Sequence, residues 1–148
     1  MRFWILLHLL GVVVWVGGMF FAYMALRPVA AKLLEPQHRL PLWAGTFAKF
    51  FPWVWVSLVL ILVSGLAMIM IFGGFAGLPW PIHAMLLVGL VMMAIFMHVF
   101  FAPYGRLKRS VAAQDWKAGG AALGQIRMLI GLNLSLGVLN VLLGVIGK

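Results

Sequence analysis

The sequence predicts an all-α membrane protein, folded as an up-and-down bundle of four transmembrane helices. Of its 148 residues, 66% are hydrophobic and only 9% are charged, whereas about a quarter of the residues in a soluble domain are charged. The hydrophobic residues gather in four stretches, each with the roughly 20 residues that a helix needs to cross a bilayer. So little chain lies outside them that we expect one transmembrane domain over residues 1–148. The four stretches are residues 3–26, 50–72, 80–103 and 123–146.

Proline and glycine mark the predicted ends of the first two stretches. Arg27-Pro28 ends the first stretch, because a proline inside a helix removes a backbone hydrogen bond. A loop over residues 27–49 follows, with a short amphipathic piece at residues 29–34. The pair Gly73-Gly74 predicts a tight hairpin between the second and third stretches. These two helices are therefore expected to be antiparallel neighbours.

The third and fourth stretches carry similar signals. Pro81 lies in the first turn of the third stretch, where the missing N–H costs nothing, and Pro103 ends that stretch. Polar residues over 111–119 predict a second loop, and the pair Gly119-Gly120 separates it from the fourth helix. Short connections between consecutive spans favour an up-down-up-down order.

The basic residues predict the orientation of the bundle. The loops over residues 27–49 and 104–122 hold four Lys or Arg residues each, and the turn over residues 73–79 holds none. By the positive-inside rule the basic loops lie in the cytoplasm, and both termini lie outside. We expect a multi-pass protein of a bacterial inner membrane with an uncleaved first helix. The net charge of +9 does not indicate nucleic-acid binding, because it is confined to loops rather than spread over one surface.

Histidine and arginine inside the spans are the candidate functional residues, because ionisable groups in hydrocarbon are costly. His8 and His83 lie roughly 8 Å and 5 Å from the outer ends of their helices, at 1.5 Å rise per residue. His98 and Arg127 share a depth near the inner ends. The sequence therefore predicts an outer pair and an inner pair. With no cysteine in the chain, thiolate and iron–sulfur sites are excluded.

The outer pair predicts a b-type haem. Two imidazoles on facing helices at one depth are the minimum for axial ligation from both sides of a porphyrin, so His8 and His83 are the predicted iron ligands. Trp15, seven residues after His8, is expected to wall the pocket, and Arg127 to pair with a propionate. His98 is a further candidate ligand. The predicted role is membrane electron transfer, an oxidoreductase function whose partner is a redox protein, a quinone or a porphyrin.

Two other interpretations stay open. Thioether and imidazole select Cu(I). Met68, Met70 and Met85 lie at a depth similar to that of His8 and His83. A copper-binding or copper-transport protein with ligands Met68, His8 and His83 is the first alternative, and mixed His/Met ligation of haem is compatible with the composition. The second is a non-catalytic assembly partner, including a homo-oligomer, whose polar residues fix helix packing. Asn133 and Asn140, which form a polar stripe on the fourth helix, fit such packing.

The motifs of the chain resemble those of a known family. The string HLLGVVVWVGGMFF at residues 8–21 is similar to the first helix of the copper resistance protein D family and of its relatives, the HemJ-type protoporphyrinogen oxidases. Four later segments look like those of small bacterial members of the same group. These segments are RLPLW, KFFPWVW, HAMLLVGLVMMAIFMHVFFAPY and IRMLIGLNLSLG.

This resemblance implies an inner-membrane helical protein. Members of the copper resistance group are associated with copper handling, and the HemJ type binds haem b and oxidises protoporphyrinogen IX. In the HemJ type the histidine that matches His8 is implicated in haem ligation. A lysine of a later helix in that pattern has no obvious match here, since Lys49 lies at a loop edge. The resemblance thus favours haem or copper binding over protoporphyrinogen oxidation.

Overall fold

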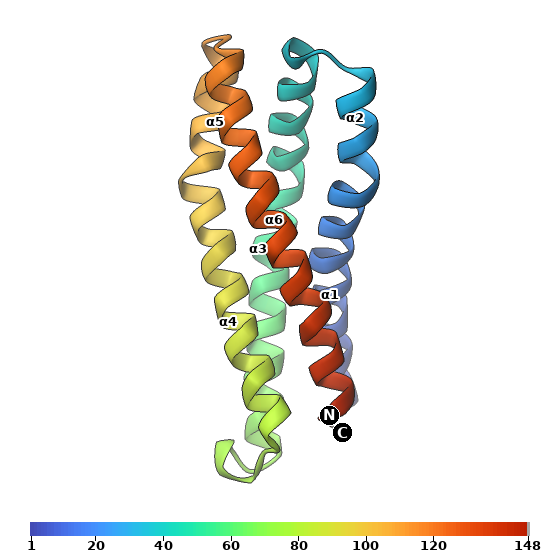
Figure 1. Ribbon diagram of the computed structural model, residues 1–148. Helices are drawn as coiled ribbons and strands as arrows, with labels where there is room; N and C mark the ends of the chain where they lie inside the picture. The colour runs from blue at the N-terminus through green and yellow to red at the C-terminus, as the bar shows by residue number, and fades with distance from the viewer. Residues whose placement is uncertain (148) are drawn as a thin grey trace.

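The computed structural model describes residues 1–147 and contains no strand among them. There are four helical spans, and consecutive spans run antiparallel, so that the N-terminus and the end of the last helix lie at the same end of the molecule (Figure 1). The predicted all-α, four-span fold is confirmed. The helices are α1 (Arg2–Phe21), the π-helix η1 (Ala22–Leu26), α2 (Arg27–Leu33), α3 (Pro36–Ile71), α4 (Trp80–Phe101), α5 (Pro103–Ala112) and α6 (Trp116–Ile146), with a short 3-10 helix η2 (Phe75–Gly77) in the hairpin.

The first span does not stop at Arg27-Pro28, as the sequence predicted, but continues to Leu33. Helix α1 passes into the π-helix η1, and η1 passes directly into α2, so that Arg2–Leu33 form one span. The backbone N–H of Arg27 bonds to the carbonyl of Ala22, five residues earlier. Such a π-turn widens the helix just before Pro28, whose ring would otherwise clash with the preceding turn. Pro28 therefore lies within a continuous helical span and does not end it.

The predicted loop over residues 27–49 is also almost entirely helical. Helix α3 begins at Pro36 rather than at residue 50, and it holds Pro41 and Pro52 in its interior. Only Leu34 and Glu35 remain as a link to α2. Pro36 lies in the first turn, where its lack of an N–H is harmless. The long α3 thus extends well beyond the stretch of high hydrophobicity that defined the second span.

The second half of the chain shows the same extension. The third span does break near Pro103, at Ala102, but a new helix α5 continues it to Ala112. The fourth span begins at Trp116 instead of residue 123, and Gly119 and Gly120 lie inside α6. The side chain of Asp115 caps α6 by accepting a hydrogen bond from the backbone N–H of Ala118 at 3.1 Å. A capped start offsets the weak helix propensity of the two glycines.

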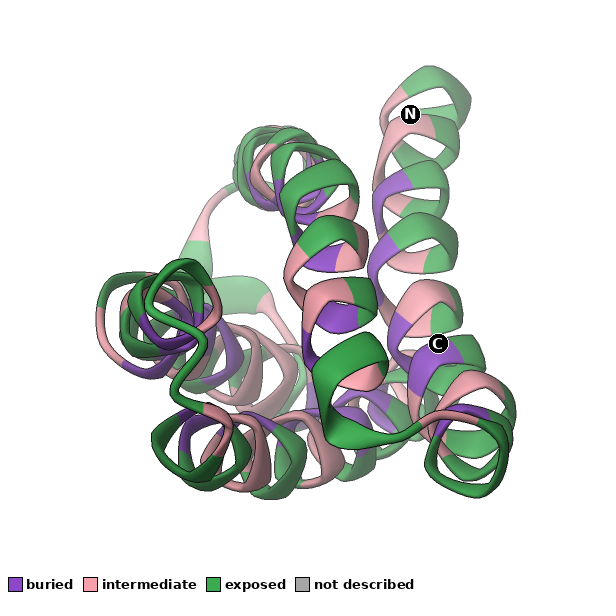
Figure 2. Cartoon of the chain, turned by 90° about the horizontal axis from the view of Figure 1, so that it is seen from above, coloured by how far each residue is buried: buried purple, intermediate pink, exposed green. Residues whose placement is uncertain are grey.

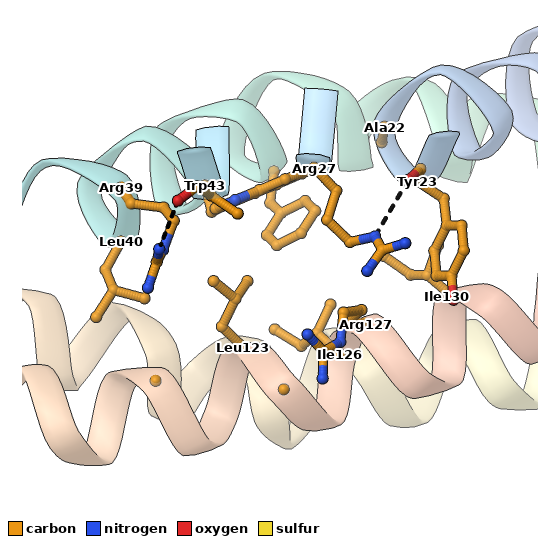
Figure 3. Close-up of a pocket in the computed structure, with 14 residues that line it drawn as sticks. Ala22, Tyr23, Arg27, Arg39, Leu40, Trp43, Leu123, Ile126, Arg127 and Ile130 are labelled. Atoms are coloured by element: carbon orange, nitrogen blue, oxygen red, sulfur yellow. Dashed lines mark hydrogen bonds between the residues drawn. The ribbon is translucent and has the colours of Figure 1, made fainter. Parts of the chain in front are cut away.

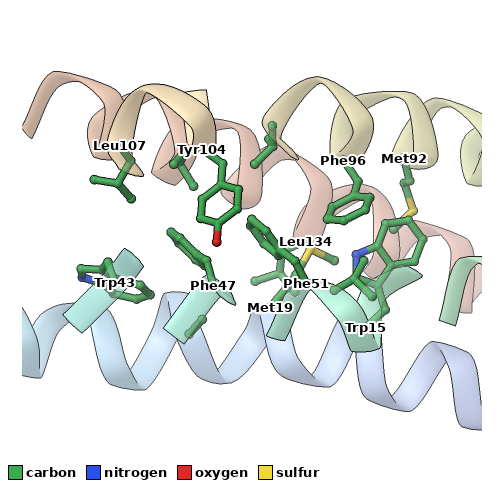
Figure 4. Close-up of a cluster of buried hydrophobic side chains, with 14 of the residues drawn as sticks. Trp15, Met19, Trp43, Phe47, Phe51, Met92, Phe96, Tyr104, Leu107 and Leu134 are labelled. Carbon is green, nitrogen blue, oxygen red and sulfur yellow. The ribbon is translucent and has the colours of Figure 1, made fainter. Parts of the chain in front are cut away.

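Helix packing places buried residues on the inner faces of the helices and exposed ones on the outside (Figure 2). Helix α1 packs mainly along α3, and α4 and α5 pack along α6. Aromatic rings form the centre of the bundle, where Phe51 contacts Phe47, Phe96 and Tyr104 (Figure 4). Large apolar side chains cover the outer surface, as expected for helices that face lipid.

The bundle has a turn end and a basic end. The turn end carries the hairpin over residues 73–79 together with the N-terminus, and the basic end carries the links between α2 and α3 and between α5 and α6. Each end holds one cavity of substantial size, and no described residue lines both.

Candidate functional site

A cavity of about 500 Å³ lies at the turn end, bordered mostly by α3, the hairpin and α4. Its walls are largely apolar side chains such as Ile61, Leu86 and Ile82. Helix α1 contributes His8 to the lining, and α6 contributes Asn140. All four spans therefore take part in one cavity. Pockets with an apolar lining and a few convergent polar groups are the usual form of ligand sites.

His8 is anchored through one ring nitrogen. Its Nδ1 lies 3.1 Å from the backbone carbonyl oxygen of Ile61 and 3.0 Å from the hydroxyl oxygen of Ser64. The Ser64 hydroxyl itself donates to the carbonyl of Leu60, so its oxygen is an acceptor toward the imidazole. Nδ1 therefore carries the proton, and Nε2 keeps a lone pair. A histidine that donates from one ring nitrogen to a carbonyl is oriented in the way that metal-ligating histidines are.

Gly65 of α3 lies beside the imidazole. A Cβ atom at this residue would lie 3.4 Å from Cε1 and 3.7 Å from Nδ1 of His8, which are ordinary contact distances. The ring therefore packs directly against α3 at Ser64 and Gly65, and the Ser64 hydroxyl accepts its hydrogen bond.

Three methionines border the same cavity as His8. Met68 lies on α3, four residues after Ser64, and Met85 and Met93 lie on α4. A Cβ atom at Gly144 of α6 would be 3.4 Å from the sulfur of Met85, an ordinary contact distance that places α6 beside this thioether. One imidazole and three thioethers are thus the soft donors among the residues that line this cavity.

Asn140 adds a polar atom that lacks a partner. Its Oδ1 is buried without a hydrogen bond from any described residue, although the residue lines the cavity. The amide lies against Gly89, where a Cβ atom would be 3.5 Å from Nδ2. A buried acceptor without a donor is costly unless a ligand or water supplies the hydrogen bond. The sequence assigned Asn140 to helix packing, and the structure puts it at the cavity instead.

The other predicted histidines lie elsewhere. His83 is on the exposed side of α4, where its Nδ1 is 3.4 Å from the carbonyl oxygen of Pro79 and its ring is 6.5 Å from that of Phe75. It is not among the residues that border the cavity with His8. His98 is exposed near the other end of α4 and borders neither large cavity. The structure therefore brings His8 together with Met68, and it leaves His83 and His98 on the surface.

Trp15 and Arg127 are likewise separated from His8. Trp15 is 3% exposed and packs edge-on against Phe96 at a centroid distance of 6.4 Å, within the aromatic core (Figure 4). Arg127 borders the cavity at the basic end. On α6 it precedes Asn140 by 13 residues, roughly 20 Å along a helix axis. Neither residue shares a cavity with His8.

No group of three or more His, Cys, Asp or Glu side chains able to hold a metal occurs in residues 1–147. A metal at the turn end would therefore need sulfur ligands from methionine in addition to the imidazole. That restriction makes the methionine thioethers of the cavity the decisive donors for any metal site there.

A family model described as Copper resistance protein D matches residues 44–146. The chain belongs to the copper resistance protein D family. It is accordingly a multi-pass membrane protein of the copper resistance type. The matched segment includes Met68, Met85 and Asn140, whereas His8 precedes it. No curated protein and no solved structure matches the chain significantly.

The sequence did not identify several residues that border the two cavities or contact His8. Ser64 and Gly65 are common residue types inside an apolar helix, and only their contact with His8 from another span gives them a role. The sequence places Arg39 in a predicted loop, yet in the structure it borders a cavity at the basic end together with Arg27. Tertiary contact, rather than spacing along one helix, identifies these residues.

Proposed function

We propose that this protein binds Cu(I) in the turn-end cavity, with His8, Met68 and Met85 as the donor residues. The observation that carries the proposal is the state of His8. Its Nδ1 is engaged by Ile61 and Ser64, which leaves the Nε2 lone pair available in a cavity that methionine thioethers also border. Membership of the copper resistance protein D family supports copper as the ligand.

The chemistry of the donors favours the cuprous ion over harder cations. Thioether sulfur is a soft ligand that selects Cu(I), and imidazole also binds copper. Harder cations such as Mg²⁺ or Ca²⁺ need carboxylate or carbonyl oxygens, and no acidic residue borders the cavity. A Cu(I) ion carries one positive charge, and apolar walls penalise it less than they penalise a divalent ion. The cavity therefore suits transient binding of Cu(I) during handling or transport.

The size of the cavity supports a second candidate, a b-type haem. About 500 Å³ exceeds what a single ion needs and falls within the range of small-molecule pockets. His8 would supply one axial nitrogen and Met68 or Met85 a sulfur, and a bound haem would supply one-electron redox chemistry. Against this candidate, none of the described residues of the lining is Lys or Arg, so propionates would lack a cationic partner. Arg127 borders the other cavity.

The orientation in the membrane follows from the charge distribution. We propose that the basic end faces the cytoplasm and that the turn end, with the copper site, faces the outside of a bacterial inner membrane. The support is the same as in the sequence, namely eight Lys or Arg residues in residues 27–49 and 104–122 against none in residues 73–79. A reporter enzyme fused after Lys148 is expected to be active outside the cytoplasm. Activity of a cytoplasm-specific reporter at that position would contradict this orientation.

The copper proposal is tested with the purified protein in detergent. We expect one Cu(I) per chain by metal analysis after reconstitution under reducing conditions, and no Soret band. His8→Ala is expected to weaken Cu(I) affinity at least about 100-fold in competition with a colourless Cu(I) chelator, because it removes the nitrogen donor.

Methionine variants provide a matched comparison. Met68→Leu keeps the size of the side chain and removes the sulfur, and it is expected to weaken Cu(I) affinity about tenfold or more. Met70→Leu is the control, because Met70 lies on the same helix, is 70% exposed and does not border the cavity. Equal effects of the two variants would contradict the copper site. A Soret band that persists in the native protein and changes in His8→Ala would establish the haem candidate in its place.

A further inference from the structure

A second cavity, of about 250 Å³, lies at the basic end of the bundle (Figure 3). Helices η1, α2 and α3 border one side, and α6 borders the other. Three arginines line it, namely Arg27, Arg39 and Arg127. Figure 3 shows Arg27 and Arg127 extending toward the space between the helices from opposite sides. No Asp or Glu is among the lining residues, so the cavity carries an uncompensated positive charge.

Two of the three guanidinium groups are held by the protein itself. The Nε of Arg27 donates to the carbonyl oxygen of Tyr23 at 3.1 Å, and its Cζ lies 4.3 Å from the centre of the Tyr23 ring. Tyr23 in turn packs against Gly131 of α6, where a Cβ atom would be 3.0 Å from the ring. The Nη1 of Arg39 donates to the carbonyl oxygen of Ala31 at 3.5 Å. Each of these side chains keeps further N–H donors for a ligand.

The protein offers little to neutralise this cluster. The chain has only two acidic residues. Asp115 is engaged in capping α6, and no ion pair to Glu35 or Asp115 occurs within residues 1–147. Three like charges around one cavity repel one another, and an anion bound between them would relieve that repulsion. The cluster therefore fits an anionic ligand better than it fits a structural role.

The π-helix and the apolar walls of this cavity indicate which class of anion it would bind. The cavity includes Ala22 and Tyr23 of the π-helix η1, and π-turns within helices occur frequently at functional sites. Its remaining walls are apolar and aromatic, with Trp43, Phe47 and Ile130 beside the arginines. Arginine binds phosphate through paired N–H donors, and apolar walls next to such donors suit a ligand that carries both phosphate and hydrocarbon.

We propose that the basic-end cavity is a binding site for a phosphate group, supplied either by the head group of an anionic phospholipid or by a free phosphate anion. Arg127 contacts the phosphate from α6, and Arg27 contacts it from α2. The ligand thereby bridges the first and fourth spans at the end opposite to His8. Because no residue is shared between the cavities, this site is independent of the proposed copper site.

The test uses native mass spectrometry of the purified full chain in detergent, with added phosphatidylglycerol, phosphatidylcholine or inorganic phosphate. We expect phosphatidylglycerol to be retained and phosphatidylcholine to be lost at the same activation energy. Arg127→Gln is expected to weaken retention about tenfold, the effect of removing one charge-assisted hydrogen-bonding group. Arg127→Lys keeps the charge but lacks the paired donors. Its retention of phosphatidylglycerol is expected to lie between that of the unsubstituted protein and that of Arg127→Gln.

Arg109→Gln is the matched control, because it removes one positive charge from α5 at the same end without touching the cavity. It is expected to change retention less than about twofold. Retention of inorganic phosphate with the same dependence on Arg127 assigns the site to a free phosphate, and retention of phosphatidylglycerol alone assigns it to a lipid head group. Equal losses in Arg109→Gln and Arg127→Gln, equal retention of phosphatidylcholine, or no retention of either phosphate ligand would overturn the proposal.

Discussion

The cavities at the two ends of the bundle differ in the kind of donor that they present. The turn-end cavity offers an imidazole and three thioethers between apolar walls, whereas the basic-end cavity offers three guanidinium groups. Soft, uncharged donors suit a soft cation, and a set of fixed positive charges suits an anion. One small bundle can therefore hold two chemically opposite sites, because the helices separate them by most of the thickness of the bilayer.

The largest expected effect tests whether the two sites are independent. His8→Ala is expected to lower Cu(I) affinity at least about 100-fold while leaving retention of phosphatidylglycerol within about twofold, because mutations at sites without shared partners act separately. Arg127→Gln is expected to show the reverse pattern. Both variants are measured by chelator competition and by native mass spectrometry. A large effect of either variant on the distant ligand would break the comparison and indicate that one ligand spans both ends.

A smaller effect is expected from the residue that orients His8. Ser64→Ala removes a hydroxyl acceptor at 3.0 Å from Nδ1 but leaves the carbonyl of Ile61 in place. We expect Cu(I) affinity to fall about tenfold, the size typical of groups behind a metal ligand. Ser57→Ala is the control, because Ser57 is also buried on α3 and bonds only to the carbonyl of Trp53. If both serine variants leave affinity unchanged, the hydrogen bond does not orient the imidazole.

At the basic end, Gly131 plays the part that Ser64 plays for His8, because it positions the Tyr23 ring on which Arg27 stacks. Gly131→Ala would bring a methyl group to 3.0 Å from the Tyr23 ring, so that the ring and the stacked Arg27 must shift. We expect retention of the phosphate ligand to weaken a few-fold, less than in Arg127→Gln, because no donor is removed. Gly45→Ala is the control, since a Cβ atom there meets nothing within 4 Å and Gly45 borders neither cavity. An effect in Gly131→Ala no larger than that in Gly45→Ala would contradict this role of Tyr23.

The smallest effect is expected from substitution of a residue of α6 that lies between the two cavities. Asn133 is buried, and its Nδ2 donates to the carbonyl of Met92 at 3.2 Å, joining α6 to α4. Hydrogen bonds between transmembrane helices contribute about 0.6 kcal/mol on average, so Asn133→Ala is expected to lower the free energy of unfolding by about that amount. Denaturation in mixed micelles measures it. Both ligands are expected to bind as before, and loss of either would show that Asn133 couples the sites.

The sequence by itself determined the membrane class, the number of spans and their antiparallel order. These properties depend on hydropathy over about 20 residues, on turn glycines such as Gly73 and Gly74, and on loop length, all of which are local. The helix bounds were less accurate. Pro28 and Pro41 were expected outside helices, but a π-turn accommodates the first and α3 continues through the second. Whether a proline ends a helix depends on the neighbouring backbone and on the packing that holds the helix together.

Tertiary structure alone decided which candidate residues share a cavity. Depth along the helices suggested His8 with His83, yet a helical residue also has an azimuth around its axis, and that angle is fixed by packing against neighbouring helices. The structure turns His83 outward and brings His8 against Ser64, Gly65 and the cavity of Met68. In the same way Arg27, Arg39 and Arg127, distant in sequence, meet only because the first, second and fourth spans converge at the basic end. Hydropathy sets how deep a residue lies, and only the packed bundle sets what it faces.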